Sequence, residues 1–311
     1  MDYIAMNPVK AGLVRSPQEW KSSSSYKENQ LPARRRRSVK MKIIKDIEYI
    51  PGGGERNRLD VYVPDGIEIP APAILRIHGG AWRAYSKNDL HVAHRLIDHG
   101  FIFVSANYRY SSQAKFPAQL EDCKSAVRWM RANSAEYGID PDRIGVCGDS
   151  AGGHLACLLG VTGNTRHFDV GLNLTRRSDV QAVGAWYPPT DFLVWEEHFK
   201  ECGFSDETAA SVFECIPPLL GSSISSAPKN AKLASPMSYV HPGSAPYLLI
   251  HGKKDPVVPY LQSVVFAEAL KKEGVEAETI LIDDAIHGGP QFEDDVNFTP
   301  LSEFFRRHLS S

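Results

Sequence analysis

The sequence predicts an α/β protein built on a mostly parallel central sheet with helices on both faces. Short apolar segments of strand length alternate with longer amphipathic segments from residue 41 onward, and this alternation is typical of parallel sheets with crossover helices. The length of 311 residues is enough for one large α/β domain. Such sheets bind ligands at the carboxyl ends of their strands, so motifs that directly follow expected strands are the candidates for chemistry.

We expect two antiparallel strands first, and then alternating helices and parallel strands. The expected strands are Lys42–Ile50, Arg58–Val63, Ala73–Ile77, Phe101–Ala106, Arg143–Cys147, Val180–Trp186, Tyr247–Ile250 and Glu276–Ile282. The expected helices are Ser86–His99, Pro117–Tyr137, Ala151–Gly160 and Pro259–Lys272, with a last helix near Pro300 behind Thr299 as N-cap. Ser86 and Asp89 have the spacing of a capping box. The less regular segment 192–235 is interpreted as a small insertion near the mouth of the site.

The first 40 residues differ from the rest of the chain. An arginine run, Arg34–Arg37, is not followed by the apolar segment that a secretory signal requires. The segment 3–26, YIAMNPVKAGLVRSPQEWKSSSSY, resembles the C-terminal end of a transposase of the REP-associated tyrosine type. We therefore expect residues 1–40 to be a disordered or non-native extension, with Met41 as the natural start. Residues 41–311 are expected to form the functional domain.

Composition and charge favour a globular protein that acts on a small molecule. Hydrophobic residues make up 42% of the chain and charged residues 23%, and the formal net charge is −2. No basic field attracts nucleic acid, and no apolar run approaches the roughly 20 residues of a membrane helix. We expect a cytoplasmic protein without nucleic-acid or membrane partners, and a homodimer is left open. None of the five cysteines forms a CxxC pair, and a bridge between Cys202 and Cys215 is also left open.

The segment 148–152, Gly-Asp-Ser-Ala-Gly, fits the pattern G-x-S-x-G. It follows an expected strand and opens an expected helix, as a nucleophile elbow requires. The serine of an elbow lies on a sharp, strained turn, so the flanking positions must be nearly bare, and Gly148, Gly152 and Gly153 meet this need. The helix N-terminus also favours negative charge beside Ser150. Ser150 is therefore the candidate nucleophile.

The segment 78–82, His-Gly-Gly-Ala-Trp, directly follows another expected strand. An acyl-transfer site needs preorganised N–H donors where the oxyanion forms, and glycines let backbone amides approach a substrate. The expected oxyanion donors are the amides of Gly80 and Ala151, with Gly79 or Ala81 as an additional donor. His78 is interpreted as ordering this loop rather than acting as a base.

The acid and the base of a triad should follow the serine in that order. Asp255 lies in the loop after the strand that ends at residue 250, and His287 lies in the loop after the strand that ends at residue 282. Both are in the required order, so we expect Asp255 to be the acid and His287 the base.

Five other positions are weaker candidates. His154 lies on the elbow helix, too close in sequence to arch over the serine, and His251 is interpreted as bracing the acid loop. Asp283–Asp284 would have to fold back to reach the histidine ring. Asp191 follows the preceding strand and is the best rival acid.

With these motifs in order, the chain resembles a known family. HGGAW, GDSAGGHLA, HGKKDPVVP and AIHG, together with FPAQLEDCKSAVRWMRANSAEYGIDPDRIGV, are similar to the feruloyl-esterase-like (BD-FAE-like) branch of the α/β hydrolases. That branch is related to the hormone-sensitive-lipase esterases and the kynurenine formamidases. The resemblance covers about residues 42–309. It implies an esterase acting on short acyl, acetyl or feruloyl esters, with Ser150, Asp255 and His287 as the triad. The third oxyanion donor is in doubt, because this chain has HGGA where the lipase-like esterases usually have HGGG.

The expected reaction is acyl transfer to the serine followed by hydrolysis, without a metal or organic cofactor. The aromatic residues expected to wall the substrate pocket are Trp82, Tyr108, Tyr187, Phe192 and Trp195. An amide hydrolase of the arylformamidase type is the nearest alternative. A peptidase is less favoured because there is no room for a gating domain, and the complete triad argues against a catalytically inactive binding protein.

Overall fold

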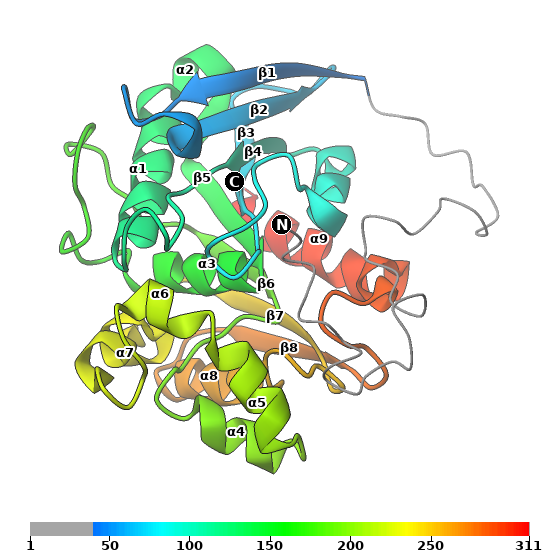
Figure 1. Ribbon diagram of the computed structural model, residues 1–311. Coiled ribbons are helices and arrows are strands. Elements are labelled where there is room, and N and C mark those ends of the chain that lie inside the picture. The colour runs from blue at the N-terminus through cyan, green and yellow to red at the C-terminus, as the bar shows by residue number, and fades with distance from the viewer. Residues whose placement is uncertain (1–39, 311) are drawn as a thin grey trace, which may run out of the picture.

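The strands of the computed structural model form one sheet within residues 40–310, which are the residues that the structure describes. They are β1 (Met41–Glu48), β2 (Arg58–Pro64), β3 (Ala71–Ile77), β4 (Ile102–Ala106), β5 (Ile139–Asp149), β6 (Ala182–Trp186), β7 (Tyr247–Gly252) and β8 (Ala277–Ile282). Their order is β1-β2-β4-β3-β5-β6-β7-β8 (Figure 1). β2 is antiparallel to both β1 and β4, and all other neighbours are parallel. The predicted α/β fold with a mostly parallel sheet is confirmed. The predictions for the N-terminal extension, including its likeness to a transposase end, fall on residues outside those described.

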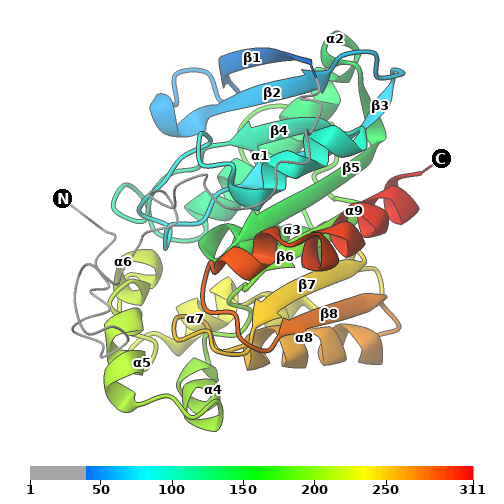
Figure 2. The ribbon, with the colours of Figure 1, turned by 90° about the vertical axis from the view of Figure 1, so that its right-hand side faces the viewer.

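Helices cover both faces of this sheet (Figure 2). One face carries α1 (Ala118–Ala132), α3 (Ala151–Val161) and α8 (Leu261–Lys272), and the other carries the 3-10 helix η3 (His91–His99) and α9 (Asp295–Leu309). Successive residues of one strand enter opposite cores, as Ile74 and Leu75 of β3 do. Burial on both faces explains why these strands are continuous apolar runs rather than alternating ones.

The helix predicted from Ser86 begins only at His91. The expected local contact exists, since Asp89 Oδ2 accepts a hydrogen bond from the Ser86 amide at 2.8 Å. However, the Lys87 ammonium is buried in an ion pair with Asp60 at 2.7 Å. This long-range ion pair holds residues 86–90 out of the helix. The spacing of Ser86 and Asp89 in the sequence did not indicate the pair.

The long helix predicted over 117–137 is interrupted at Asn133. The backbone amide and the side-chain amide of Asn133 both donate to the Trp129 carbonyl, at 3.0 and 2.9 Å. Asn133 is the C-cap residue of α1, because its φ of −107° and ψ of 14° leave the helical range, and the short helix α2 (Ser134–Tyr137) follows.

The last helix begins one turn earlier than predicted, with Asp294 as its N-cap residue instead of Thr299. Pro300 therefore lies inside α9, where it forgoes one hydrogen bond to the carbonyl of an exposed first-turn residue. The additional turn buries Phe298 completely, with its ring against His99 and Arg95 of η3, and this burial offsets the lost bond.

The insertion is more regular than the sequence indicated. It contains α4 (Trp195–Glu201), α5 (Asp206–Phe213), α6 (Ile216–Leu220) and α7 (Pro228–Ala234). These helices lie at the edge of the sheet where β5, β7 and β8 end (Figure 2). At its base the Phe192 amide donates to Ser235 Oγ at 3.0 Å. Cys202 and Cys215 are both free thiols, so the bridge left open above does not form.

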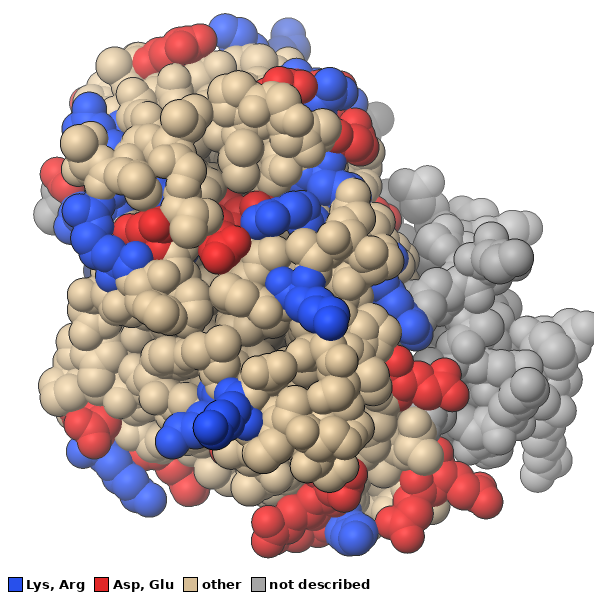
Figure 3. All heavy atoms as spheres, turned by 60° about the vertical axis from the view of Figure 1, so that its left-hand side comes forward, with Lys and Arg blue, Asp and Glu red and all other residues tan. Residues whose placement is uncertain are grey.

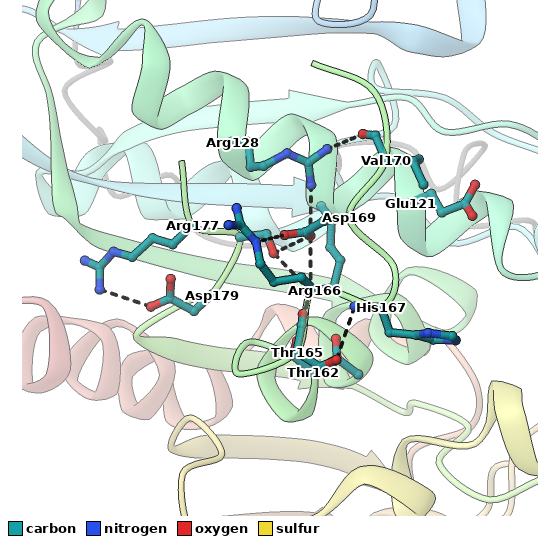
Figure 4. Close-up of polar contacts among 12 residues, drawn as sticks. Glu121, Arg128, Thr162, Thr165, Arg166, His167, Asp169, Val170, Arg177 and Asp179 are labelled. Atoms are coloured by element: carbon teal, nitrogen blue, oxygen red, sulfur yellow. Dashed lines mark hydrogen bonds and ion pairs between the residues drawn. The ribbon is translucent and has the colours of Figure 1, made fainter. Parts of the chain in front are cut away.

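A buried charge cluster attaches the long connection after α3 to helix α1 (Figure 4). Arg128 Nη1 lies 2.9 Å and Lys124 Nζ 3.6 Å from Asp169 Oδ1, and all three side chains are at most 4% exposed. Lys124 also donates to Ser178 Oγ at 3.0 Å. Burial lowers the pKa of Lys124 to about 8. The cluster lies at the far end of α3 from Ser150 and stabilises the scaffold.

Basic and acidic side chains are interspersed over most of the face shown in Figure 3, and acidic side chains gather along its lower edge. Within the described part of the chain, no helix is both long enough and apolar enough to cross a bilayer.

Asp169→Asn should destabilise the protein by about 3–5 kcal/mol, because it leaves two buried cations without their carboxylate. Urea unfolding at pH 7 measures this. Asp142→Asn is the matched control, since Asp142 is 79% exposed in its pair with Arg177 and should lose less than about 1 kcal/mol. Equal losses in the two variants would contradict a structural role for the buried cluster.

Candidate active site

Ser150 lies on the turn between β5 and α3 with φ 52° and ψ −121°. This strained conformation is held by hydrogen bonds on both sides. The Ser150 amide donates to the Trp186 carbonyl and the Ser150 carbonyl accepts from the His154 amide, each at 2.9 Å. A Cβ on Gly148 would overlap the Gly152 backbone, so the residues around the serine must be bare. The elbow therefore has the geometry that its sequence indicated.

His287 links Ser150 to Asp255. His287 Nε2 lies 3.0 Å from Ser150 Oγ, and His287 Nδ1 lies 2.7 Å from Asp255 Oδ2. Asp255 is fully buried in the loop after β7, while the His287 side chain, in the loop after β8, keeps 20% exposure. Three loops at the carboxyl edge of the sheet thus bring together a nucleophile, a base and an acid in hydrogen-bonding order.

The Asp255 carboxylate is held by groups other than His287. Its Oδ1 accepts from the amides of Val257 and Val258 at 2.8 and 2.9 Å, and its Oδ2 lies 3.4 Å from His251 Nε2. Burial favours the neutral acid, but the His287 charge and the hydrogen bonds from His251 and His287 hold the pKa of Asp255 well below its usual range. Asp255 is therefore ionised and can fix the tautomer of His287.

His251 lies beneath the acid loop. Its Nε2 donates to the Val258 carbonyl at 2.9 Å, and its Nδ1 is in hydrogen-bond contact with Ser263 Oγ at 2.7 Å. The ring therefore connects the acid loop to α8, which is the bracing position that the sequence indicated.

The backbone of the loop after β3 has a conformation suited to donating N–H groups to an oxyanion. Gly80, Ala81 and Trp82 have φ values of 93°, 48° and 57°, and the Gly80 carbonyl accepts from the amides of residues 83 and 84. Within the described residues, neither the Gly80 nor the Ala151 amide donates to another group. Gly79 packs on Asp149, since a Cβ there would lie 2.5 Å from Asp149 Oδ2. The three predicted oxyanion residues, Gly79, Gly80 and Ala151, therefore come from adjoining segments.

His78 is buried beneath this loop. Its Nε2 lies 2.8 Å from Arg56 Nη2, and because a guanidinium can only donate, Nε2 accepts and Nδ1 donates to the Gly79 carbonyl at 2.8 Å. The ring stacks on Tyr108 with centroids 4.4 Å apart. Burial and the Arg56 charge lower the pKa of His78 to about 3, so it orders the loop as a neutral ring.

Two charged residues at this edge were missed by the sequence reasoning. Arg76 of β3 is buried and forms an ion pair with Asp149, the residue before Ser150. Burial favours the neutral form of Asp149, but the Arg76 charge outweighs it and lowers the pKa of Asp149. Arg76 could have been suspected, since it interrupts an apolar strand. Arg56 lies in the short 3-10 helix η2 (Glu55–Asn57) between β1 and β2 and gave no such signal.

The five predicted pocket aromatics are at most 2% exposed. Tyr187 lies against the triad, with its ring centroid 4.4 Å from that of His287, and Tyr108 lies under His78. Trp82, Phe192 and Trp195 pack on one another beside α3. Exposed apolar side chains occur instead at Tyr85, Leu193 and Ile286, which neighbour site residues in the chain.

The rival acids lie elsewhere. Asp191 Oδ1 accepts from the Leu193 amide at 2.9 Å, Asp283 pairs with Lys253 at 2.7 Å, and Asp284 accepts from a glutamine. Among residues 40–310, Asp255 is the carboxylate in contact with His287. The same residues contain no group of three or more metal-ligating side chains.

Ser150→Ala should abolish labelling by a fluorophosphonate probe, because the reagent needs a nucleophile activated by His287. Mass spectrometry of the labelled peptide measures this, with circular dichroism to show that the variant is folded. Labelling that persists on another residue of the folded variant would contradict the assignment of Ser150.

Asp255→Asn should slow the same labelling by about 10³- to 10⁴-fold, because the amide favours the wrong tautomer of the base. The matched control is Asp191→Asn, for which the labelling rate should stay within about threefold of wild type. If Asp191→Asn slowed labelling much more than Asp255→Asn did, Asp191 would be the acid instead.

The chain is similar to known proteins over most of its length. Residues 59–270 match the family model BD-FAE. The esterase LipQ of Mycobacterium tuberculosis is 34% identical over 238 residues, which cover 74% of this chain and 53% of LipQ. The chain spans about half the length of the curated relatives that it matches.

Solved structures of esterases are also similar to most of this chain. A truncated carbohydrate esterase from gut microbiota is 30% identical, with a TM-score of 0.77 over 87% of this chain and 97% of its own. A thermophilic esterase from Thermogutta terrifontis, with butyrate bound, is 26% identical, with a TM-score of 0.63 over 85% of this chain and 91% of its own. The chain therefore belongs to the BD-FAE family, and its fold is that of the α/β hydrolases.

Proposed function

We propose that this protein is a serine carboxylic-ester hydrolase. The observation that carries the proposal is the continuous contact from Asp255 Oδ2 through His287 to Ser150 Oγ, at 2.7 and 3.0 Å. The esterase names of several relatives support it.

In the proposed reaction His287 takes the Ser150 proton as the oxygen attacks the ester carbonyl, and Asp255 stabilises the resulting imidazolium. The amides of Gly80 and Ala151, with Gly79 beside them, donate to the oxyanion. His287 then gives its proton to the leaving alcohol. A water activated by the same ring releases the acid from the acyl-enzyme.

The proposed substrates carry short acyl, acetyl or feruloyl groups. The tightly packed cluster of Trp82, Phe192 and Trp195 favours a short acyl group, because it leaves little space beside α3. The butyrate in the Thermogutta terrifontis esterase and the carbohydrate esterase among the similar structures agree with this class.

The direct test compares hydrolysis of p-nitrophenyl acetate, methyl ferulate, acetylated xylan and N-formylkynurenine by wild type and by Ser150→Ala. We expect ester hydrolysis by wild type and a loss of about 10⁴-fold or more in the variant. A higher kcat/KM for the formamide than for every ester would replace the proposal by an arylformamidase-type amide hydrolase.

Along a series of p-nitrophenyl esters, kcat/KM should peak between acetyl and butyryl and decline beyond about six carbons. Each methylene that fits improves transition-state binding by up to about 1 kcal/mol, and one that clashes reverses the trend. An optimum at dodecanoyl or longer, with activation at an oil–water interface, would indicate a lipase instead.

A further inference from the structure

His154 lies one turn after Ser150 on α3 and is fully buried. Its two ring nitrogens contact different parts of the chain. Nδ1 lies 3.1 Å from the indole Nε1 of Trp82 in the loop after β3, and Nε2 lies 2.7 Å from the carbonyl of Ala234, the last residue of α7. One imidazole thus connects the elbow helix, the oxyanion loop and the insertion.

The partners of His154 fix its tautomer. The Ala234 carbonyl can only accept, so Nε2 carries the proton, and the Trp82 indole can only donate, so Nδ1 must be free to accept. Only the neutral, Nε2-protonated ring satisfies both contacts. Burial lowers the pKa of His154 to about 4, so the ring is in this form at neutral pH.

Trp82 ends the oxyanion loop in a conformation that needs support. Trp82 and Ala81 have left-handed backbones, with φ values of 57° and 48°, which cost roughly 1–3 kcal/mol each for residues with a side chain. The Trp82 carbonyl accepts from the Ser111 amide at 2.7 Å, and the indole N–H is held by His154. These two contacts fix Trp82, which lies two positions after Gly80.

We infer that His154 is a positioning residue for the oxyanion hole, which holds the Gly80–Trp82 backbone through the Trp82 indole and aligns it with the elbow helix. Because the same ring also bonds to the Ala234 carbonyl, this alignment depends on the position of α7. The ring centroid of Phe192 lies 5.3 Å from that of His154, so both ends of the insertion pack on it. The inference rests on the proposed function for its kinetic readout.

The experiment uses Trp82→Phe, which removes the donor and keeps a ring, and His154→Leu, which removes the acceptor, alone and combined. His154→Asn is the conservative variant, because its amide oxygen can replace Nδ1 as acceptor. Trp129→Phe is the matched control, since Trp129 packs on Tyr137 of α2, away from the site. Each is assayed for kcat, KM and inhibition by a phenylboronic acid, which forms a tetrahedral adduct with the active-site serine.

We expect Trp82→Phe and His154→Leu each to lower kcat about 10- to 100-fold with little change in KM, because a displaced donor weakens transition-state stabilisation only. The boronate inhibition constant should rise in parallel. The double variant should be no slower than the slower single variant. His154→Asn should recover most of the loss, and Trp129→Phe should match wild type.

Additive losses, a change confined to KM, unchanged boronate affinity or a His154→Asn variant as slow as His154→Leu would overturn the inference. If the variants do not fold, ¹⁵N spectra of histidine- and tryptophan-labelled wild type test the inference instead. They should show a neutral, Nε2-protonated His154 at pH 7 and a hydrogen-bonded Trp82 indole, and an Nδ1-protonated ring would overturn it. These spectra need no turnover, so a failure of the proposed ester hydrolysis remains distinguishable.

Discussion

The Cα of Gly152 packs directly on the carbonyls of Ile77 and His78, and any Cβ at that position would overlap them. Because of this contact, the start of α3 and the loop after β3 are close enough for amides from both to face one substrate atom. The parallel register between Ile77 and Gly148 sets the distance between these segments. A larger side chain at Gly152 would therefore separate the donors even if every triad residue remained in place.

The histidines at this edge divide into two groups by burial. His78, His154 and His251 are fully buried, and each has both ring nitrogens engaged in fixed contacts. Among these four, His287 keeps 20% exposure, and within residues 40–310 the hydrogen-bond partner of its Nε2 is the serine hydroxyl. Proton transfer through His287 therefore needs no rearrangement of the three rings that hold the loops.

The catalytic residues could be predicted because each belongs to a short motif at a strand end, where chain order and spacing carry the information. The parallel sheet could be predicted from chain order as well, because strand-length and helix-length segments alternate in the sequence. Contacts between distant segments that no motif marks could not be predicted. The ion pair of Lys87 with Asp60 moves the start of η3 to His91, and Arg56 of η2 orders His78. The predicted aromatic walls show the same limit, since sequence position placed them near the site but could not show that they are buried.

The insertion is attached to the rest of the domain both at its base and along its length. The Phe192 amide bonds to Ser235 Oγ, and the Met237 amide to the Thr190 carbonyl, both at 3.0 Å. Ser235 follows directly on Ala234, whose carbonyl holds His154. Between these anchor points the Leu219 carbonyl of α6 accepts from the Phe116 amide at 2.9 Å, and His198 Nδ1 of α4 lies 2.9 Å from Gln262 Nε2 of α8. A change at Ala234 or Ser235 would be transmitted to the oxyanion loop through His154, because Trp82 bonds to the other nitrogen of that ring.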